Sequence, residues 1–190
     1  MIAKTFFGFE EILANELKML GAQDVEQGVR MVSFKGDKGF MYKANLSLRT
    51  ALKILKPIYF FKANNEQALY KGIYSMNWSK ILSANQTFVI DTTVHSEYFN
   101  HSEFVSQKCK DAIVDQFRER TGQRPSIEKV YPDLRINIHI DKDQVSVALD
   151  TSGNSLHQRG YRTATNIAPI NEVLAAGILL LSGWEGQGHF

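Results

Sequence analysis

Cysteine and proline are scarce in this chain of 190 residues, which contains one cysteine, Cys109, and four prolines. A single thiol excludes an intramolecular disulfide framework and a zinc site built from several cysteines, and it favours a reducing compartment. An excess of charge of one sign is also absent, because 22 Lys and Arg residues stand against 20 Asp and Glu residues. Any affinity for nucleic acid must therefore come from local clustering of cations.

Long hydrophobic runs are missing as well. Residues 1–6 lack a basic stretch followed by a long apolar run, and the most apolar segment, 173–181, is shorter than the roughly 20 residues of a membrane span. We therefore expect a soluble cytoplasmic protein without membrane contact. The five histidines show no HExxH spacing and no serine lies in a GxSxG elbow, so we expect neither a metal site nor a small hydrolase.

The first 61 residues show alternating strand and helix patterns in the order β-α-β-β-α-β. Apolar residues recur at helical spacing between Phe9 and Leu20, with two acids in the first turn and Gly21 just past the end. This order is that of a ferredoxin-like domain. The strands are expected at 2–6, 25–28, 31–35 and 51–61, and the helices at 9–20 and 37–44.

A polar stretch at 62–65 divides this unit from a second α+β unit. The clearest pattern there is a double alternation at 134–141 and 145–149, which predicts an antiparallel hairpin with one buried face. The other expected elements are a helix around 69–73, a strand at 87–93 and a helix at 102–120. Asn100 is expected to cap that last helix together with Glu103, and Cys109 is expected to be a buried residue of its apolar stripe.

The tail differs in composition from both units. Pro169 can open a helix, and residues 170–181 are then apolar nearly all round, so this helix must be buried on most sides. We expect a further domain to begin here, and self-association if the helix stays exposed. The predicted organisation is residues 1–63, residues 64–153, and a linker with the start of another domain at 154–190.

Five segments carry a resemblance to a known family. In order and spacing they resemble the N-terminal half of the bacterial 23S ribosomal RNA guanine-N2 methyltransferases that contain a THUMP domain. The segment LHQRGYR is the most specific of them. The segments are 108–115, 132–137, 148–153, 156–162 and 168–176.

The resemblance implies a ferredoxin-like domain, then an RNA-binding THUMP domain, then a Rossmann-like methyltransferase domain that uses S-adenosylmethionine. The glycine-rich loop and the Asn-Pro-Pro-Tyr motif of that catalytic domain are absent from this sequence. We therefore expect no cofactor in this chain and no catalytic residues, with S-adenosylmethionine bound by the full-length parent. The implied partner is RNA, in the first place 23S rRNA.

Residues 108–135 form the first candidate RNA surface, with seven cations and five acids. The residues alone favour a solvated helix face with ion pairs such as Lys108 with Asp111. The resemblance favours phosphate contacts instead, made by Lys108, Lys110, Arg124 and Arg135.

The second candidate RNA surface is His157, Arg159, Tyr161 and Arg162, a basic cluster with an aromatic residue interleaved. Guanidinium groups hold phosphates while flat side chains stack on unpaired bases. The alternative is a linker whose arginines bond to the C-termini of helices, and both interpretations stay open.

Asn171 and Glu172 open the tail helix. The family resemblance suggests that they contact the cofactor pocket, whereas the alternative is an acid placed favourably in the first turn of a helix.

Two further functions remain open at this point. The same THUMP module occurs in tRNA-modifying enzymes, both methyltransferases and thiolation enzymes. A ferredoxin-like protein-interaction domain without any RNA role is the other alternative, and it predicts binding that hardly depends on salt.

Overall fold

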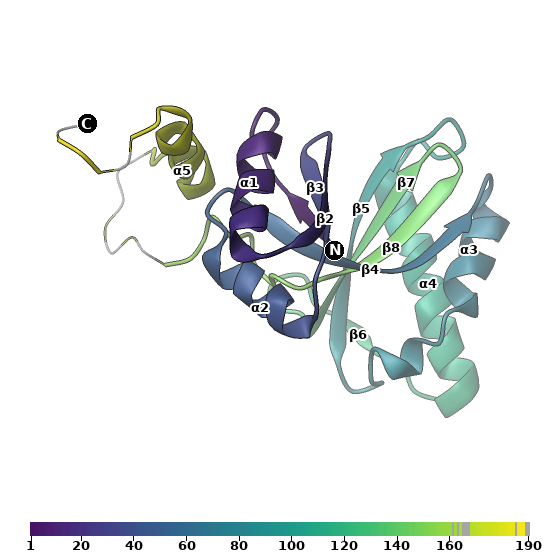
Figure 1. The fold of residues 1–190 in the computed structure, drawn as a ribbon. Helices are drawn as coiled ribbons and strands as arrows, with labels where there is room; N and C mark the ends of the chain where they lie inside the picture. Colours follow the sequence, from purple (N-terminus) through teal and green to yellow (C-terminus); the bar gives the residue numbers. More distant parts are fainter. Residues whose placement is uncertain (161, 163, 165–167, 185, 189–190) are drawn as a thin grey trace. The chain divides into compact units, whose positions relative to one another are not determined.

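The computed structural model describes residues 1–160, 162, 164, 168–184 and 186–188 (Figure 1). The chain divides into two compact units, residues 1–56 with 151–190 and residues 57–150. The sequence places the divisions a few residues later, after 63 and after 153. Strand β4 (Lys53–Lys62) runs from the first unit into the second.

The first unit has the expected order of elements, and its ferredoxin-like character is confirmed. Strand β1 pairs antiparallel with both β3 and β4, and β2 pairs with β3, which gives the order β2-β3-β1-β4. Helix α1 ends at Gly21, whose φ of 98° is the left-handed conformation that favours glycine. The elements are β1 (Ile2–Lys4), α1 (Glu10–Leu20), β2 (Gln23–Gly28), β3 (Met31–Lys35), α2 (Lys38–Ser47) and β4.

The second unit is also α+β. Strand β5 pairs parallel with β7, and β7 pairs antiparallel with β8 from Ile136 opposite Leu149 to Asp141 opposite Gln144, so the predicted hairpin is confirmed. Helices α3 and α4 lie side by side, and α4 packs on β5 (Figure 1). The elements are α3 (Glu66–Ser75), the 3-10 helix η1 (Trp78–Lys80), β5 (Thr87–His95), α4 (Ser102–Thr121), β6 (Ser126–Ile127), β7 (Leu134–Asp141) and β8 (Gln144–Asp150).

The predicted cap of α4 is wrong. Because the helix begins at Ser102, its N-cap position is His101, and no side chain caps it. Asn100 lies one residue too early to accept a hydrogen bond from the first turn. The expectation for Cys109 is confirmed, since the residue is fully buried and burial raises the pKa of its thiol to about 12.

Helix α5 (Glu172–Leu181) confirms the helical pattern of the tail, although it begins at an Asn171 cap and not at Pro169. It contacts α1, and Gly177 packs so tightly that a Cβ there would lie 2.1 Å from the Phe9 ring. Ile178 and Leu181 are exposed. Whether α5 opens a further domain stays a prediction.

None of the helices described is long and apolar enough to span a membrane. Among those same residues, no group of histidine, cysteine and acidic side chains has the arrangement of a metal site.

Candidate nucleic-acid interface

The second unit carries a hollow of about 550 Å³ between β5 and α4. Strand β6 pairs only with Thr87 and Phe88 of β5. The remainder of this β5 edge therefore has no neighbouring strand within the described ranges, and the hollow opens beside it. Its walls come from β5, from the first half of α4, and from Ile127, Lys129 and Arg135.

Three cations of the predicted RNA surface line this hollow, and two of them, Lys110 and Arg135, are among the four predicted phosphate contacts. Arg135 is largely covered, with 17% of its side chain exposed, and its Nη1 lies 3.6 Å from Oδ2 of Asp91. Lys110 Nζ lies 3.0 Å from Oδ1 of Asp111. Lys129, which the sequence does not single out, is exposed and forms no ion pair in the part of the chain that is described.

The other two predicted residues of this surface do not line the hollow. Lys108 pairs with Glu66 of α3 and not with Asp111, and the hydrogen bond that its ammonium donates to Glu66 raises the pKa of the lysine. Arg124 is exposed in the loop between α4 and β6. The structure thus brings Lys110 and Arg135 together with Lys129 and leaves Lys108 and Arg124 outside.

Neutral polar side chains complete the lining, and sequence reasoning missed them. Ser106 donates a hydrogen bond of 3.0 Å to the Ile90 carbonyl, which closes part of the open edge of β5. Gln107 and Thr92 also line the hollow. The sequence offers one indication for Thr92. Phe88 and Ile90 are the buried residues on one face of β5, and Thr92 is a polar residue at the next position of that face.

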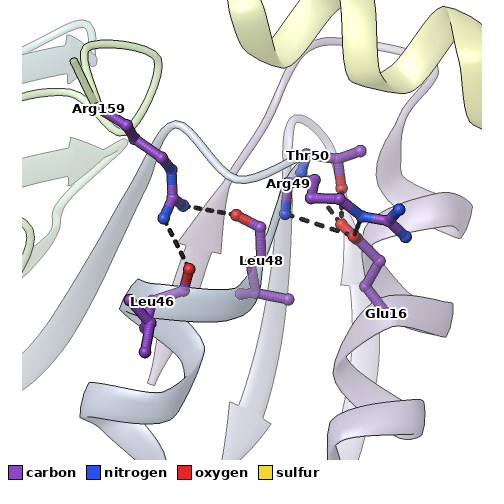
Figure 2. Close-up of polar contacts among 6 residues, drawn as sticks. All are labelled: Glu16, Leu46, Leu48, Arg49, Thr50 and Arg159. Atoms are coloured by element: carbon purple, nitrogen blue, oxygen red, sulfur yellow. Dashed lines mark hydrogen bonds and ion pairs between the residues drawn. The ribbon is translucent and has the colours of Figure 1, made fainter. Parts of the chain in front are cut away.

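Arg159 lies in the first unit and binds the end of helix α2 (Figure 2). Its Nη1 donates to the carbonyls of Asn45 at 2.9 Å and Leu46 at 2.8 Å, and its Nη2 donates to Leu48 at 2.6 Å. Its Nε donates to Leu156 at 3.0 Å. Helix α2 has no basic residue in its own last turn, so Arg159 supplies the cation that helix C-termini favour.

The segment before Arg159 is fixed to the start of β4. The Thr151 amide donates to the Ile54 carbonyl, Ser152 Oγ accepts from the Ile54 amide, and the Leu156 amide donates to Leu52. Leu156 is part of the hydrophobic core of this unit. The sequence allows two interpretations of Arg159, either an RNA contact or part of a linker whose arginines bond to helix C-termini. The contacts of Arg159 in this structure are those of the linker interpretation.

The other members of that cluster are engaged locally or lie outside the described residues. His157 Nδ1 shares a hydrogen bond of 2.8 Å with Ser155, and Arg162 Nε lies 3.6 Å from Oε1 of Glu172. Arg162 also donates to the Ile170 carbonyl. Tyr161 is one of the residues that the structure does not describe. Arg159, Arg162 and Glu172 line one cavity of about 420 Å³ together with Arg49.

The two predicted cofactor contacts have different surroundings. Asn171 accepts hydrogen bonds from the amides of Val173 and Leu174, so its side-chain oxygen caps α5. Glu172 has one buried carboxylate oxygen, Oε2, without a hydrogen-bond partner among the residues described. Only Glu172 thus retains an acceptor for a ligand hydroxyl, and these two residues alone do not make a cofactor site.

Comparisons with known proteins agree with this architecture. Residues 1–55 match the RlmL ferredoxin-like domain, and residues 63–150 match the THUMP domain. The chain is 43% identical over 181 residues to the ribosomal RNA large subunit methyltransferase K/L of Syntrophotalea carbinolica. This match covers 95% of the chain and 25% of that protein, so the chain spans about a quarter of the length of the curated relative.

Two solved structures are also similar to this chain over nearly its whole length. The crystal structure of a possible methylase from Clostridium difficile 630 is 30% identical, with a TM-score of 0.82, and the match covers 96% of this chain and 48% of that one. The structure of SMU.472 in complex with SAH is 33% identical with a TM-score of 0.79, at the same coverage of 96% and 48%. The chain therefore contains an RlmL ferredoxin-like domain followed by a THUMP domain, and over 95% of its length it is similar to the N-terminal part of a large-subunit rRNA methyltransferase K/L.

Proposed function

We propose that this chain is the RNA-binding part of an S-adenosylmethionine-dependent guanine-N2 methyltransferase, and that it positions 23S rRNA for a catalytic domain of the whole protein. The identity of 43% to a large-subunit rRNA methyltransferase K/L supports the substrate class. The single structural observation that carries the proposal is the hollow of the THUMP domain, at which Lys110, Lys129 and Arg135 converge.

The three cations differ in how available they are to phosphates. Arg135 is held by Asp91 and largely covered, so it contributes a fixed positive charge to the wall of the hollow. Lys110 pairs with Asp111 at the surface, and Lys129 is exposed. A surface ion pair is weak, so a phosphate can readily replace Asp111 as the partner of Lys110. Phosphate contacts of this kind set the position of the RNA without reading its sequence.

The cofactor belongs to the whole protein in this proposal. S-adenosylmethionine would supply the methyl group that the exocyclic amine of a guanine accepts, and the structure of the relative SMU.472 is a complex with SAH. The residues of this chain contribute RNA binding and orientation. The Arg159 contacts fix the segment that follows the THUMP domain to the ferredoxin-like unit. These contacts would give a catalytic domain that follows this segment a fixed starting position.

The test is a titration of the chain with a 23S rRNA fragment over a series of salt concentrations. The wild-type affinity should fall steeply as salt rises, and the slope of log K against log salt should become shallower by about 1.5 in the double variant K110A/K129A. The matched control is K18A/K35A on the first unit, which removes Lys18, a lysine without an ion pair to any residue that the structure describes, and Lys35, which is paired with Asp24.

Three results would contradict the proposal. A salt-independent interaction would favour the protein-interaction domain. An equal loss of affinity in the control variant would mean that the THUMP hollow is not the binding surface. Transfer RNA that competes better than the rRNA fragment would favour a tRNA-modifying enzyme.

A further inference from the structure

We propose that the hollow between β5 and α4 receives the base of one unpaired RNA nucleotide, with Thr92 as a hydrogen-bonding residue in its wall. This inference rests on the proposed RNA-binding function and makes it more specific. It predicts that the chain prefers an RNA segment with an extruded or looped-out base to a continuous duplex.

The size of the hollow supports a base as the occupant. Its volume of about 550 Å³ lies within the range of roughly 300–1,000 Å³ that small-molecule pockets occupy. The bases of an intact A-form RNA helix are stacked, and its deep major groove admits no side chains, so a pocket of this kind can be entered only by a base that has left the stack.

The chemistry of the wall is suited to a base and poorly suited to a row of phosphates. Two carboxylates, Asp91 and Glu103, line the hollow with its three cations. A carboxylate repels a phosphate, but it accepts hydrogen bonds from the N–H groups of a base or from a ribose hydroxyl. Lys129 and Lys110 can hold the phosphates that flank the nucleotide.

Thr92 provides the observation that is independent of charge. Its Oγ1 is buried and has no hydrogen-bond partner among the described residues, and Thr92 is one of the residues that line the hollow. A buried hydroxyl without a partner costs free energy, whereas valine has the same shape without the polar atom. A hydroxyl at this position is explained if a ligand atom completes its hydrogen bond.

The open edge of β5 gives the ligand access. Beyond Phe88 no strand covers this edge within the described ranges, and Ser106 bonds only the Ile90 carbonyl. Thr92 lies two residues further along the same strand. An incoming nucleotide therefore meets Thr92 from the uncovered side of the strand.

The experiment compares two RNA probes and two variants of the full chain. The probes are a blunt RNA duplex and the same duplex carrying one bulged nucleotide. The variants are Thr92→Val, which removes the hydroxyl, and the matched control Thr93→Val, whose exposed side chain lies on the opposite face of the strand and outside the hollow. Thermal melting of each variant reports on folding.

The expected result is that the wild-type chain binds the bulged duplex more tightly than the blunt one. Thr92→Val should weaken binding to the bulged duplex by about two- to tenfold, leave binding to the blunt duplex unchanged, and melt at or above the wild-type temperature. Thr93→Val should behave as the wild type with both probes.

Two results overturn the inference. Equal binding of the two probes by the wild-type chain, or an unchanged preference in Thr92→Val, means that the hollow takes no base, while the proposed RNA-binding function stands. Absence of binding to both probes at low salt removes the proposed function together with this inference.

Discussion

The guanidinium of Arg159 donates a hydrogen bond of 2.6 Å to the backbone carbonyl of Leu48, a residue that precedes it by 111 positions in the sequence. Together with its bonds to Asn45 and Leu46, this contact joins the segment after the THUMP domain to the end of α2. The first arginine of the LHQRGYR segment therefore has a structural role in the ferredoxin-like unit.

Replacing this arginine should cost stability more than RNA affinity. Arg159→Met retains an unbranched apolar stem but removes every hydrogen bond to the α2 carbonyls. We expect it to lower the free energy of unfolding by about 1–3 kcal/mol, as measured by urea denaturation. Arg124→Met removes an exposed arginine and should leave stability unchanged. A loss of RNA affinity in Arg159→Met at unchanged stability would contradict this expectation and support Arg159 as a direct RNA contact.

The buried carboxylate of Glu16 should be a second determinant of stability in the first unit (Figure 2). Its Oε2 accepts from the amide and hydroxyl of Thr50, at 3.0 and 2.6 Å, and its Oε1 accepts from Arg49 Nε at 2.9 Å. Glu16→Ala leaves buried donors without a partner, so we expect a loss of about 2–4 kcal/mol. Glu16→Gln keeps one acceptor oxygen and should lose less.

The control for this prediction is Glu11→Ala on the exposed face of the same helix, α1. If Glu16→Ala unfolds in urea at the same midpoint as Glu11→Ala, the carboxylate does not stabilise the loop between α2 and β4.

The phenol of Tyr70 should ionise only at unusually high pH. It donates a hydrogen bond of 2.9 Å to Asp115, and burial followed by this hydrogen bond raises its pKa to about 12. Because the pKa in the folded chain exceeds the ordinary value of 10.0, its contribution to stability is complete below pH 10. That contribution is lost as the pH rises through the pKa of the folded state.

A spectrophotometric titration of the phenols checks this prediction. The wild-type chain should show a late phenolate transition that Tyr70→Phe lacks, and the variant should lose less stability between pH 10 and about 12. Identical titration curves for the two proteins would contradict it. Tyr131→Phe, which removes the hydroxyl of a side chain that is 81% exposed, is the control.

Gly177 should be required for the packing of α5 on the first unit. An added Cβ would lie 2.1 Å from the Phe9 ring, so Gly177→Ala must displace either the ring or the helix. Hydrogen exchange of the α5 amides should become faster by about tenfold or more. Ala176→Ser adds an atom at the neighbouring position, and its exchange should stay close to that of the wild type. Unchanged exchange in Gly177→Ala would show that α5 does not depend on this contact.

The elements that the sequence predicts well are those whose pattern is set by one buried face. Leu134–Asp141 alternates because Ile136, Ile138 and Ile140 are buried, and α1 has acids in its first turn and a glycine just past its end. Such signals are local, so the order of strands and helices could be predicted without a structure, except for the short η1 and β6 of the second unit.

The contacts that the sequence could not predict join residues far apart in the chain. Lys108 has Asp111 within reach on its own helix, yet its partner is Glu66 on α3. Lys129 joins the hollow because β6 is short and brings the following residues beside β5. Arg159 resembles a phosphate contact in sequence, and only the position of α2 reveals the carbonyls that it binds.

Binding of RNA by the THUMP domain at the hollow of Lys110 and Lys129 is tested most directly by lysine acetylation with and without a 23S rRNA fragment. We expect bound RNA to protect Lys110 and Lys129 strongly. Lys108, held by Glu66, and Lys18 and Lys35 of the first unit should be modified to the same extent in both samples. Protection of Lys18 and Lys35 with no change at Lys110 and Lys129 would contradict the account.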